Sequence, residues 1–261
     1  MTVQQILDYV NSLAPANMKY DWDNVGLLCG RRDQTVKTVL VALDPFMDVC
    51  TEAKQVGADL ILTHHPLIFK APKTVTTDDT VGQCILFLAA NGISAVNAHT
   101  NLDCAPEGVN DVLAKTLGLE NVEVAYPMGT DGEGRPYGLL RTGTVSQMPL
   151  TDFLAQVKDR LHAPVLRYAD GGKPVHRVAV GGGACGDAYT DALAAGCDTL
   201  VTADVKYNQF WDAHDLGLNL IDAGHFYTEN PVTAVLASKL QAAFPELNVI
   251  VSKHRDCMQF F

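Results

Sequence analysis

The sequence predicts an α/β protein made of two repeated halves with largely parallel sheets. Residues 39–65, VLVALDPFMDVCTEAKQVGADLILTHH, align without a gap on residues 178–204, VAVGGGACGDAYTDALAAGCDTLVTAD. Both segments have the pattern strand, helix, glycine and strand, which is the βαβ unit of a parallel sheet. The identical positions are Val39/Val178, Val41/Val180, Asp48/Asp187, Thr51/Thr190, Ala53/Ala192, Gly57/Gly196, Asp59/Asp198 and Thr63/Thr202.

The similarity continues further along each copy. NGISAVNAHTNLD at residues 91–103 resembles LGLNLIDAGHFYTE at 216–229, and each is a short apolar strand followed by a loop with histidine and acidic residues. Helices with the similar endings VLAKTL and VLASKL come next. We therefore expect a first α/β half over residues 1–124 and a second over 125–261. Residues 121–177, which include the Gly-rich turn GTDGEG, are expected to form a connecting region.

The first element expected along the chain is a helix in the segment MTVQQILDYVNSLAP. Apolar residues recur at helical spacing from Val3 to Leu13, and Thr2 with Gln5 fits a capping box. The segment lacks the basic region and the long apolar run of a signal peptide. No apolar stretch approaches the roughly 18 residues that a membrane helix needs, so no membrane span is predicted.

Composition excludes some classes of function. The formal net charge of −11 argues against binding to a nucleic-acid backbone as the main activity, because such affinity comes from clustered Lys and Arg. The seven cysteines are an odd number and none form a Cys-x-x-Cys motif. This pattern favours free thiols in a reducing compartment, so we expect a cytoplasmic protein.

Polar residues gather where the expected strands end, which is where open parallel sheets bind ligands. Imidazole and carboxylate groups are the mixed ligands of zinc, iron, manganese or nickel. Five such groups exceed what one catalytic zinc takes, and they suit two ions that share a carboxylate. The five groups are His64, His65, Asp103, His225 and Glu229. Asp204 and Lys206 also stand at the end of a strand in the second copy.

Five motifs together resemble the YbgI-like, or Nif-three-like, dinuclear-metal family of GTP cyclohydrolase I type 2 homologues in its short form. The resemblance spans nearly the whole chain. It implies a dinuclear metal site between the two halves and a homohexameric assembly. The motifs are WDNVGLLCG (22–30), LTHHPLIF (62–69), HTNLD (99–103), TADVKYN (202–208) and GHFYTE (224–229).

The resemblance also implies a set of metal ligands. His65 and Asp103 would bind one divalent ion, His64 and His225 the other, and Glu229 would bridge them. Two such ions lower the pKa of a water held between them, which is typical of a hydrolase. The family name implies ring opening of GTP by attack on the imidazole carbon of guanine. The alternative is a metal-binding or regulatory protein without turnover.

Three further residues are candidates for roles at the site. His99 is expected to position a ligand or carry a proton, or else to bond only to the backbone at a strand end. Asp204 and Lys206 match the family motif, and Lys206 is expected to meet an anionic substrate group, unless the two form surface ion pairs. DWDNVGLLCG is expected to be structural, although Asp23 could reach the site. Surface or satisfied positions are expected for His162, His176, His214 and His254.

A competing motif is GGGACG at residues 181–186, which fits the dinucleotide-binding pattern G-x-G-x-x-G between a strand and a helix. Asp204 stands 18 residues beyond Gly186, near the spacing of a ribose-binding acid. Two observations favour the metal hypothesis. The equivalent turn in the first copy, ALDPFMD, lacks the glycines, and Asp204 is the repeat equivalent of His65. Dinucleotide binding is therefore a minor alternative.

Overall fold

The computed structural model describes residues 1–261, and the chain divides into two compact units. The chain passes between them three times, within α4 (Thr100–Cys104), within α10 (Pro231–Ala243) and after Arg255. The expected halves 1–124 and 125–261 are consecutive stretches of the chain, each with one copy of the repeat. The two compact units are instead defined by which segments pack together. The first unit comprises residues 1–102 and 233–255, and the second comprises residues 103–232 and 256–261.

A five-stranded sheet forms the centre of the first unit, with the order β1-β4-β3-β2-β13. Neighbouring strands are parallel except for β1, which is antiparallel to β4. The interior strands β2, β3 and β4 are built mostly from apolar residues, as expected where both faces are covered. The bounds are β1 Gly26–Cys29, β2 Thr38–Ala42, β3 Leu60–Thr63, β4 Ser94–Asn97 and β13 Asn248–Val251.

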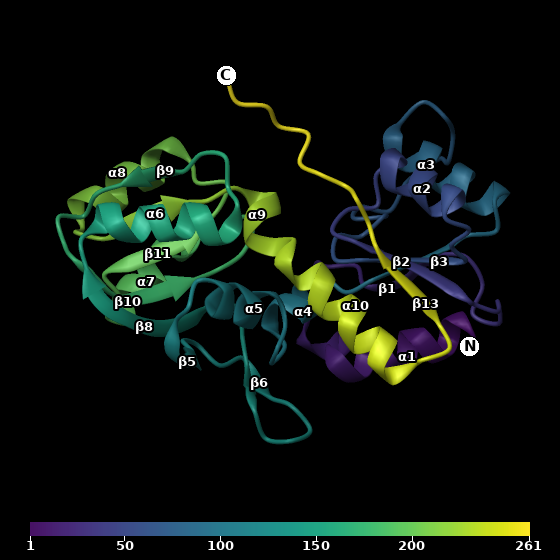
Figure 1. Ribbon diagram of the computed structural model, residues 1–261, viewed down its shortest axis with the longest axis horizontal. Coiled ribbons are helices and arrows are strands. Elements are labelled where there is room, and N and C mark those ends of the chain that lie inside the picture. The colour runs from purple at the N-terminus through teal and green to yellow at the C-terminus, as the bar shows by residue number, and fades with distance from the viewer. The chain divides into compact units, whose positions relative to one another are not determined.

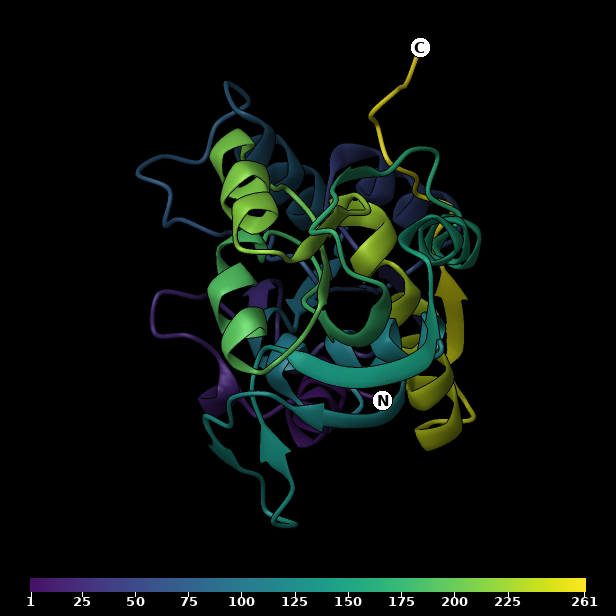
Figure 2. The same ribbon diagram turned by 90° about the vertical axis from the view of Figure 1, so that its left-hand side faces the viewer.

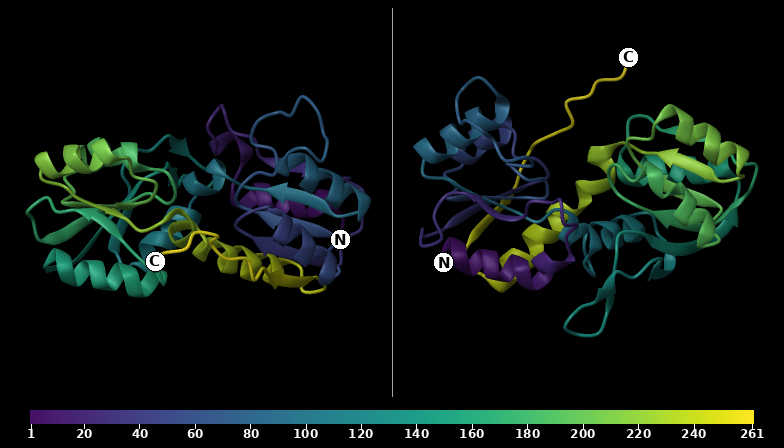
Figure 3. Two further views of the ribbon diagram at one scale, coloured as in Figure 1. Left: turned by 90° about the horizontal axis from the view of Figure 1, so that it is seen from above. Right: turned by 180° about the vertical axis from the view of Figure 1, so that it is seen from behind.

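Helices cover both faces of this sheet (Figures 1 and 3). On one face, α2 (Met47–Gln55) and α3 (Thr80–Ala90) pack on the strands through a buried apolar cluster. On the other face lies α1 (Val3–Leu13), which is followed by the short η1 (Ala16–Met18). The predicted capping box of α1 is present.

The second unit contains a six-stranded sheet with the order β5-β8-β10-β11-β12-β9. β10, β11 and β12 are parallel, whereas β5, β8 and β9 join by antiparallel pairing. The expected largely parallel arrangement therefore describes the first sheet and only the centre of the second. The bounds are β5 Glu120–Val124, β8 Arg141–Met148, β9 Arg167–Ala169, β10 Val175–Val180, β11 Thr199–Thr202 and β12 Asn219–Asp222.

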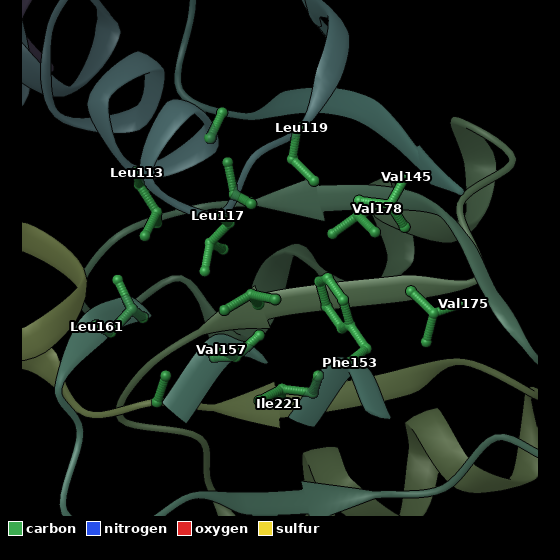
Figure 4. Close-up of a cluster of buried hydrophobic side chains, with 14 of the residues drawn as sticks. Leu113, Leu117, Leu119, Val145, Phe153, Val157, Leu161, Val175, Val178 and Ile221 are labelled. Carbon is green, nitrogen blue, oxygen red and sulfur yellow. The ribbon is translucent and has the colours of Figure 1, made fainter. Parts of the chain in front are cut away.

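Two layers of helices also enclose the second sheet (Figure 2). On one face, Phe153 and Val157 of α6 pack on Val178 and Ile221 of the sheet, and α5 extends the same apolar cluster (Figure 4). On the other face, α7 and α8 pack through a second cluster. The helices are α5 Val109–Thr116, α6 Leu150–Leu161, α7 Tyr189–Ala194, α8 Tyr207–Asp215 and α9 His225–Glu229, with η2 Gly186–Ala188.

The predicted repeat is visible in the topology. α2 connects the parallel strands β2 and β3, and η2 with α7 connects the parallel strands β10 and β11. We expected the region 121–177 to connect the halves. It instead contributes strands to the second sheet, together with α6, which packs on that sheet. It also holds a small hairpin of β6 (Gly129–Thr130) and β7 (Pro136–Tyr137) around the predicted Gly-rich turn. No helix combines the length and hydropathy of a membrane span.

Candidate metal centre

Three histidines of the first unit come together at the carboxyl ends of two neighbouring strands. His64 and His65 directly follow β3, and His99 lies two residues beyond β4. Because β3 and β4 are parallel neighbours, their carboxyl ends lie at the same edge of the sheet. The candidate ligand nitrogens of the three imidazoles lie within 4.8 Å of one another. The adjacent histidines of the sequence are therefore part of a cluster that could hold a metal ion.

Each of these imidazoles uses Nδ1 for a hydrogen bond to an oxygen atom. Because a carbonyl or ionised carboxylate oxygen can only accept, Nδ1 carries a proton, and in the neutral imidazole Nε2 then carries the lone pair. This orientation is typical of histidines that bind metals through Nε2. The pairs are His64 with the Ala98 carbonyl at 2.9 Å, His65 with Asp44 at 2.7 Å and His99 with Asp23 at 2.7 Å.

Asp23 is a buried carboxylate that holds His99 in place. Its other oxygen accepts hydrogen bonds from the Thr100 amide at 3.0 Å and the Thr100 hydroxyl at 2.5 Å. Burial alone would raise the pKa of Asp23, but the bonds from His99 and Thr100 hold that pKa well below its usual range. Asp23 is therefore ionised, and it orients His99 from a motif that we expected to be mainly structural.

Asp44 has the same relationship to His65. It lies two residues beyond the end of β2, and its second oxygen is 3.2 Å from Nε2 of His254. Burial would raise the pKa of Asp44, but the bonds from His254 and His65 lower it well below its usual range. Asp44 was not among the site residues predicted from the sequence, although its place shortly after a strand is the same signal that pointed to His64 and His65. As expected, the ring nitrogens of His254 have hydrogen-bond partners, and one of these partners is Asp44 itself.

In the second unit, His225 and Glu229 form a close pair on α9, which begins shortly after β12. The His225 Nε2 atom lies 2.9 Å from Glu229 Oε2, as expected for residues four apart on a helix. Nδ1 donates to Asp204 at 2.8 Å. Burial would lower the pKa of His225, but Asp204 and Glu229 together raise that pKa to about 11. The two carboxylates therefore strongly favour the positively charged form of the His225 imidazole.

Two carboxylates stand close together in the buried part of this unit. Asp103 is 6% exposed and Glu229 is 4% exposed. A carboxylate oxygen of each lies within 4.8 Å of the other. Burial and these two acids also raise the pKa of the nearby Cys185 thiol. Since burying neighbouring carboxylates is costly without a compensating cation, the donor set fits a divalent metal ion.

The glycine-rich loop at 181–186 packs directly against Glu229. A Cβ atom on Gly183 would lie 2.1 Å from Glu229 Oε1, and the Gly183 φ angle is +63°. The amide of Gly182 donates to Asn110 at 2.7 Å, and that of Gly183 donates to Thr228 at 3.0 Å. These amides are used within the protein, which argues against dinucleotide binding by this loop.

The two residues predicted to bind substrate, Asp204 and Lys206, have different surroundings. Asp204, with a φ angle of 51°, contacts Nδ1 of His225, one of the candidate ligands. Lys206 is 68% exposed at its side chain, and its Nζ atom lies 3.7 Å from Asp187. The Lys206 ammonium is therefore held loosely at the surface.

The model of the family Duf34/NIF3 (NGG1p interacting factor 3) matches residues 1–257. The chain belongs to the Duf34/NIF3 family. This confirms the resemblance inferred from the five motifs. A Clostridium perfringens relative named GTP cyclohydrolase 1 type 2 homolog is 35% identical over 266 residues, which cover 100% of both proteins.

Two solved structures share the fold of this chain. A Bacillus cereus protein related to NIF3 matches with a TM-score of 0.93 at 26% identity, covering 100% of this chain and 99% of that one. A Staphylococcus aureus protein matches with a TM-score of 0.92 at 29% identity, with the same coverage. The α/β architecture of this Duf34/NIF3 chain is thus that of its relatives.

Proposed function

We propose that this Duf34/NIF3 protein is a metal-dependent hydrolase with a dinuclear centre. The ligands proposed are His64, His65, Asp103, His225 and Glu229. The observation that carries the proposal is the orientation of the three ligand histidines, since each uses Nδ1 for an oxygen acceptor and directs its metal-binding capacity to Nε2. The buried acids Asp103 and Glu229 supply negative charge that two divalent cations would balance.

Within this proposal, His65 and Asp103 would hold one ion and His64 and His225 the other, with Glu229 shared between them. The pair His225–Glu229 supports these roles. The carboxylates that favour a proton on His225 also favour a divalent cation in its place, because the same field acts on either charge. A pair of divalent ions supplies Lewis acidity and a lowered pKa for a water molecule. Zn, Fe, Mn and Ni all suit these ligands.

His99 is the proposed proton carrier of the reaction. Its ligand nitrogen lies within 4.8 Å of those of His64 and His65. Asp23 fixes the His99 ring through Nδ1, so that Nε2 is the nitrogen able to exchange a proton with substrate. Lys206 is proposed to contact an anionic group of the substrate, because its exposed ammonium is held only by a long contact to Asp187. Asp204 is proposed to assist substrate binding while it orients His225.

The substrate class proposed is a nucleotide, with hydrolytic opening of the guanine imidazole ring as the specific reaction. The name of the C. perfringens relative supports this choice. A non-catalytic metal-binding or regulatory protein is the alternative. Incubation of metal-loaded protein with GTP, followed by chromatography, separates the two, and wild-type turnover that disappears in Glu229→Gln supports the hydrolase.

We also propose a cytoplasmic homohexamer. All seven cysteines are free thiols, in keeping with a reducing compartment. Sedimentation should give six times the chain mass of 28.1 kDa. A sedimentation mass equal to one chain would exclude the hexamer.

The metal site itself is tested by metal content per chain, measured by mass spectrometry on untagged protein purified without chelator. We expect close to two transition-metal ions in the wild type and a sharp fall in His65→Ala and in Glu229→Gln. His176→Ala is the matched control, because that imidazole is exposed and bonds only to the Val145 carbonyl. Wild-type protein that stays metal-free after incubation with Zn²⁺, Mn²⁺ and Fe²⁺ would refute the proposal.

A further inference from the structure

A chain of hydrogen bonds in the first unit leads from the C-terminal segment to His65. The Nδ1 atom of His254 lies 2.5 Å from Asp48, and its Nε2 atom lies 3.2 Å from one oxygen of Asp44. The other oxygen of Asp44 is 2.7 Å from Nδ1 of His65. The order is therefore Asp48, His254, Asp44 and His65, with imidazole and carboxylate alternating.

Sheet topology brings these residues together. Asp44 follows β2, Asp48 lies in the first turn of α2, and His254 follows β13. Since β13 is the parallel neighbour of β2, the segments beyond both strands lie at the same edge of the sheet.

Further bonds fasten the segment that carries His254. The Ser252 amide donates to the Val41 carbonyl at 2.8 Å. The Ser252 hydroxyl donates to Glu52 at 2.5 Å, and the Lys253 amide donates to the same carboxylate at 3.1 Å. The His254 side chain is only 9% exposed. Its imidazole is thus held in one position by both backbone and side-chain contacts.

His254 can donate through both ring nitrogens. The bond to Asp44 raises its pKa, burial opposes this, and Asp48 raises the pKa further, to about 9. A protonated His254 donates to both carboxylates at once. One oxygen of Asp44 is then occupied by His254, and the other is directed at His65.

We propose that His254 is a positioning residue for the candidate metal centre, holding Asp44 so that His65 keeps its proton on Nδ1 and its lone pair on Nε2. This inference rests on the proposed function for the role of His65 as a metal ligand. Without Asp44 in place, His65 is free to adopt the other tautomer, in which the proton occupies the ligand atom. Outer partners of metal-binding histidines change metal affinity by about 10- to 100-fold.

The test compares His254→Ala, His254→Gln and the control His176→Ala with the wild type. The His65 tautomer is read from imidazole ¹⁵N NMR shifts of metal-free protein, and Zn²⁺ affinity is measured by competition with a chelating dye. We expect His254→Ala to shift His65 toward the Nε2–H tautomer and to weaken Zn²⁺ binding about 10- to 100-fold. His254→Gln keeps an amide donor for Asp44, so it should recover part of both properties.

An unchanged His65 tautomer with unchanged Zn²⁺ affinity in folded His254→Ala would overturn the inference, and His254 would then serve only to fasten the C-terminal segment. Thermal unfolding establishes that each variant is folded, and His254→Gln replaces His254→Ala if the latter is not. The two proposals fail separately. Wild-type protein that binds no Zn²⁺ would refute the metal centre, whereas the NMR tautomer still decides whether His254 positions His65.

Discussion

His225 Nε2 lies 2.9 Å from Glu229 Oε2, one turn later in the same short helix. The contact places a basic nitrogen against a carboxylate that is 4% exposed. Its strength is reflected in the His225 pKa of about 11, to which Asp204 also contributes. Both residues belong to the proposed set of metal ligands.

Replacing Glu229 with Gln removes one of the two negative charges beside His225. We expect the pKa of His225 in chelator-treated protein to fall from about 11 toward its ordinary value of 6.5, while remaining above it because Asp204 is still present. An NMR titration of His225 measures this change. Glu133→Gln, in an exposed turn, is the control and should leave His225 unchanged. A His225 pKa that stays near 11 in Glu229→Gln would show that Glu229 is not its partner.

Gly183→Ala should lower the metal content of the protein, an effect that backbone strain alone would not produce. The new methyl group would lie 2.1 Å from Glu229 Oε1, so the carboxylate must move. Gly172→Ala is the matched control, with a φ angle of +73° and no atom within 4 Å of the added Cβ. Both variants should lose about 1–2 kcal/mol of unfolding free energy through left-handed strain. Only Gly183→Ala should also lose bound metal, and equal metal contents in the two variants would contradict this expectation.

His254 predicts a specific pH dependence of stability. Its pKa is raised from 6.5 to about 9 in the folded state by Asp44 and Asp48. A raised folded-state pKa gives stability that is complete below pH 6.5 and lost as pH rises through 9. The difference in unfolding free energy between wild type and His254→Gln should therefore shrink between these two pH values. Urea unfolding at pH 6, 7.5 and 9.5 measures it, and a difference that grows with pH would show that the sign is wrong.

Arg141 is a buried cation whose removal should strongly destabilise the second unit. Its side chain is 1% exposed, and it donates at 2.5 Å to both Asp111 and the Gly138 carbonyl. Arg141→Met leaves these acceptors without their donor. Asp111 is 28% exposed, so the loss comes mainly from the buried carbonyls that Arg141 satisfies. Each of these costs about 1–3 kcal/mol when left without a donor, which urea unfolding would detect.

Arg135→Met provides the matched control for Arg141→Met. Arg135 also forms an ion pair with an aspartate, Asp131, at 2.8 Å, but its side chain is 49% exposed. Exposed pairs contribute about 0–1 kcal/mol. Similar losses of unfolding free energy in the two variants would contradict the role assigned to burial.

The sequence by itself was sufficient to predict the parts of this protein that depend on local pattern. Alternation of strand, helix and glycine in the two copies predicted the parallel centres of both sheets, because βαβ units have short-range signatures. Polar residues after strands predicted the region of His64, His65 and His225, since the ends of parallel strands lie at one edge of a sheet.

Only the tertiary structure decided which distant segments join these centres. β13 pairs with β2 although the rest of the fold separates them in the chain, and this pairing brings His254 to Asp44. The antiparallel strands β5, β8 and β9 likewise add to the second sheet, from a region that the sequence predicts to be a connection. Such pairings depend on which exposed sheet edge and which apolar faces remain to be covered once the local units have formed. That is a property of the packed chain, and no local sequence pattern encodes it.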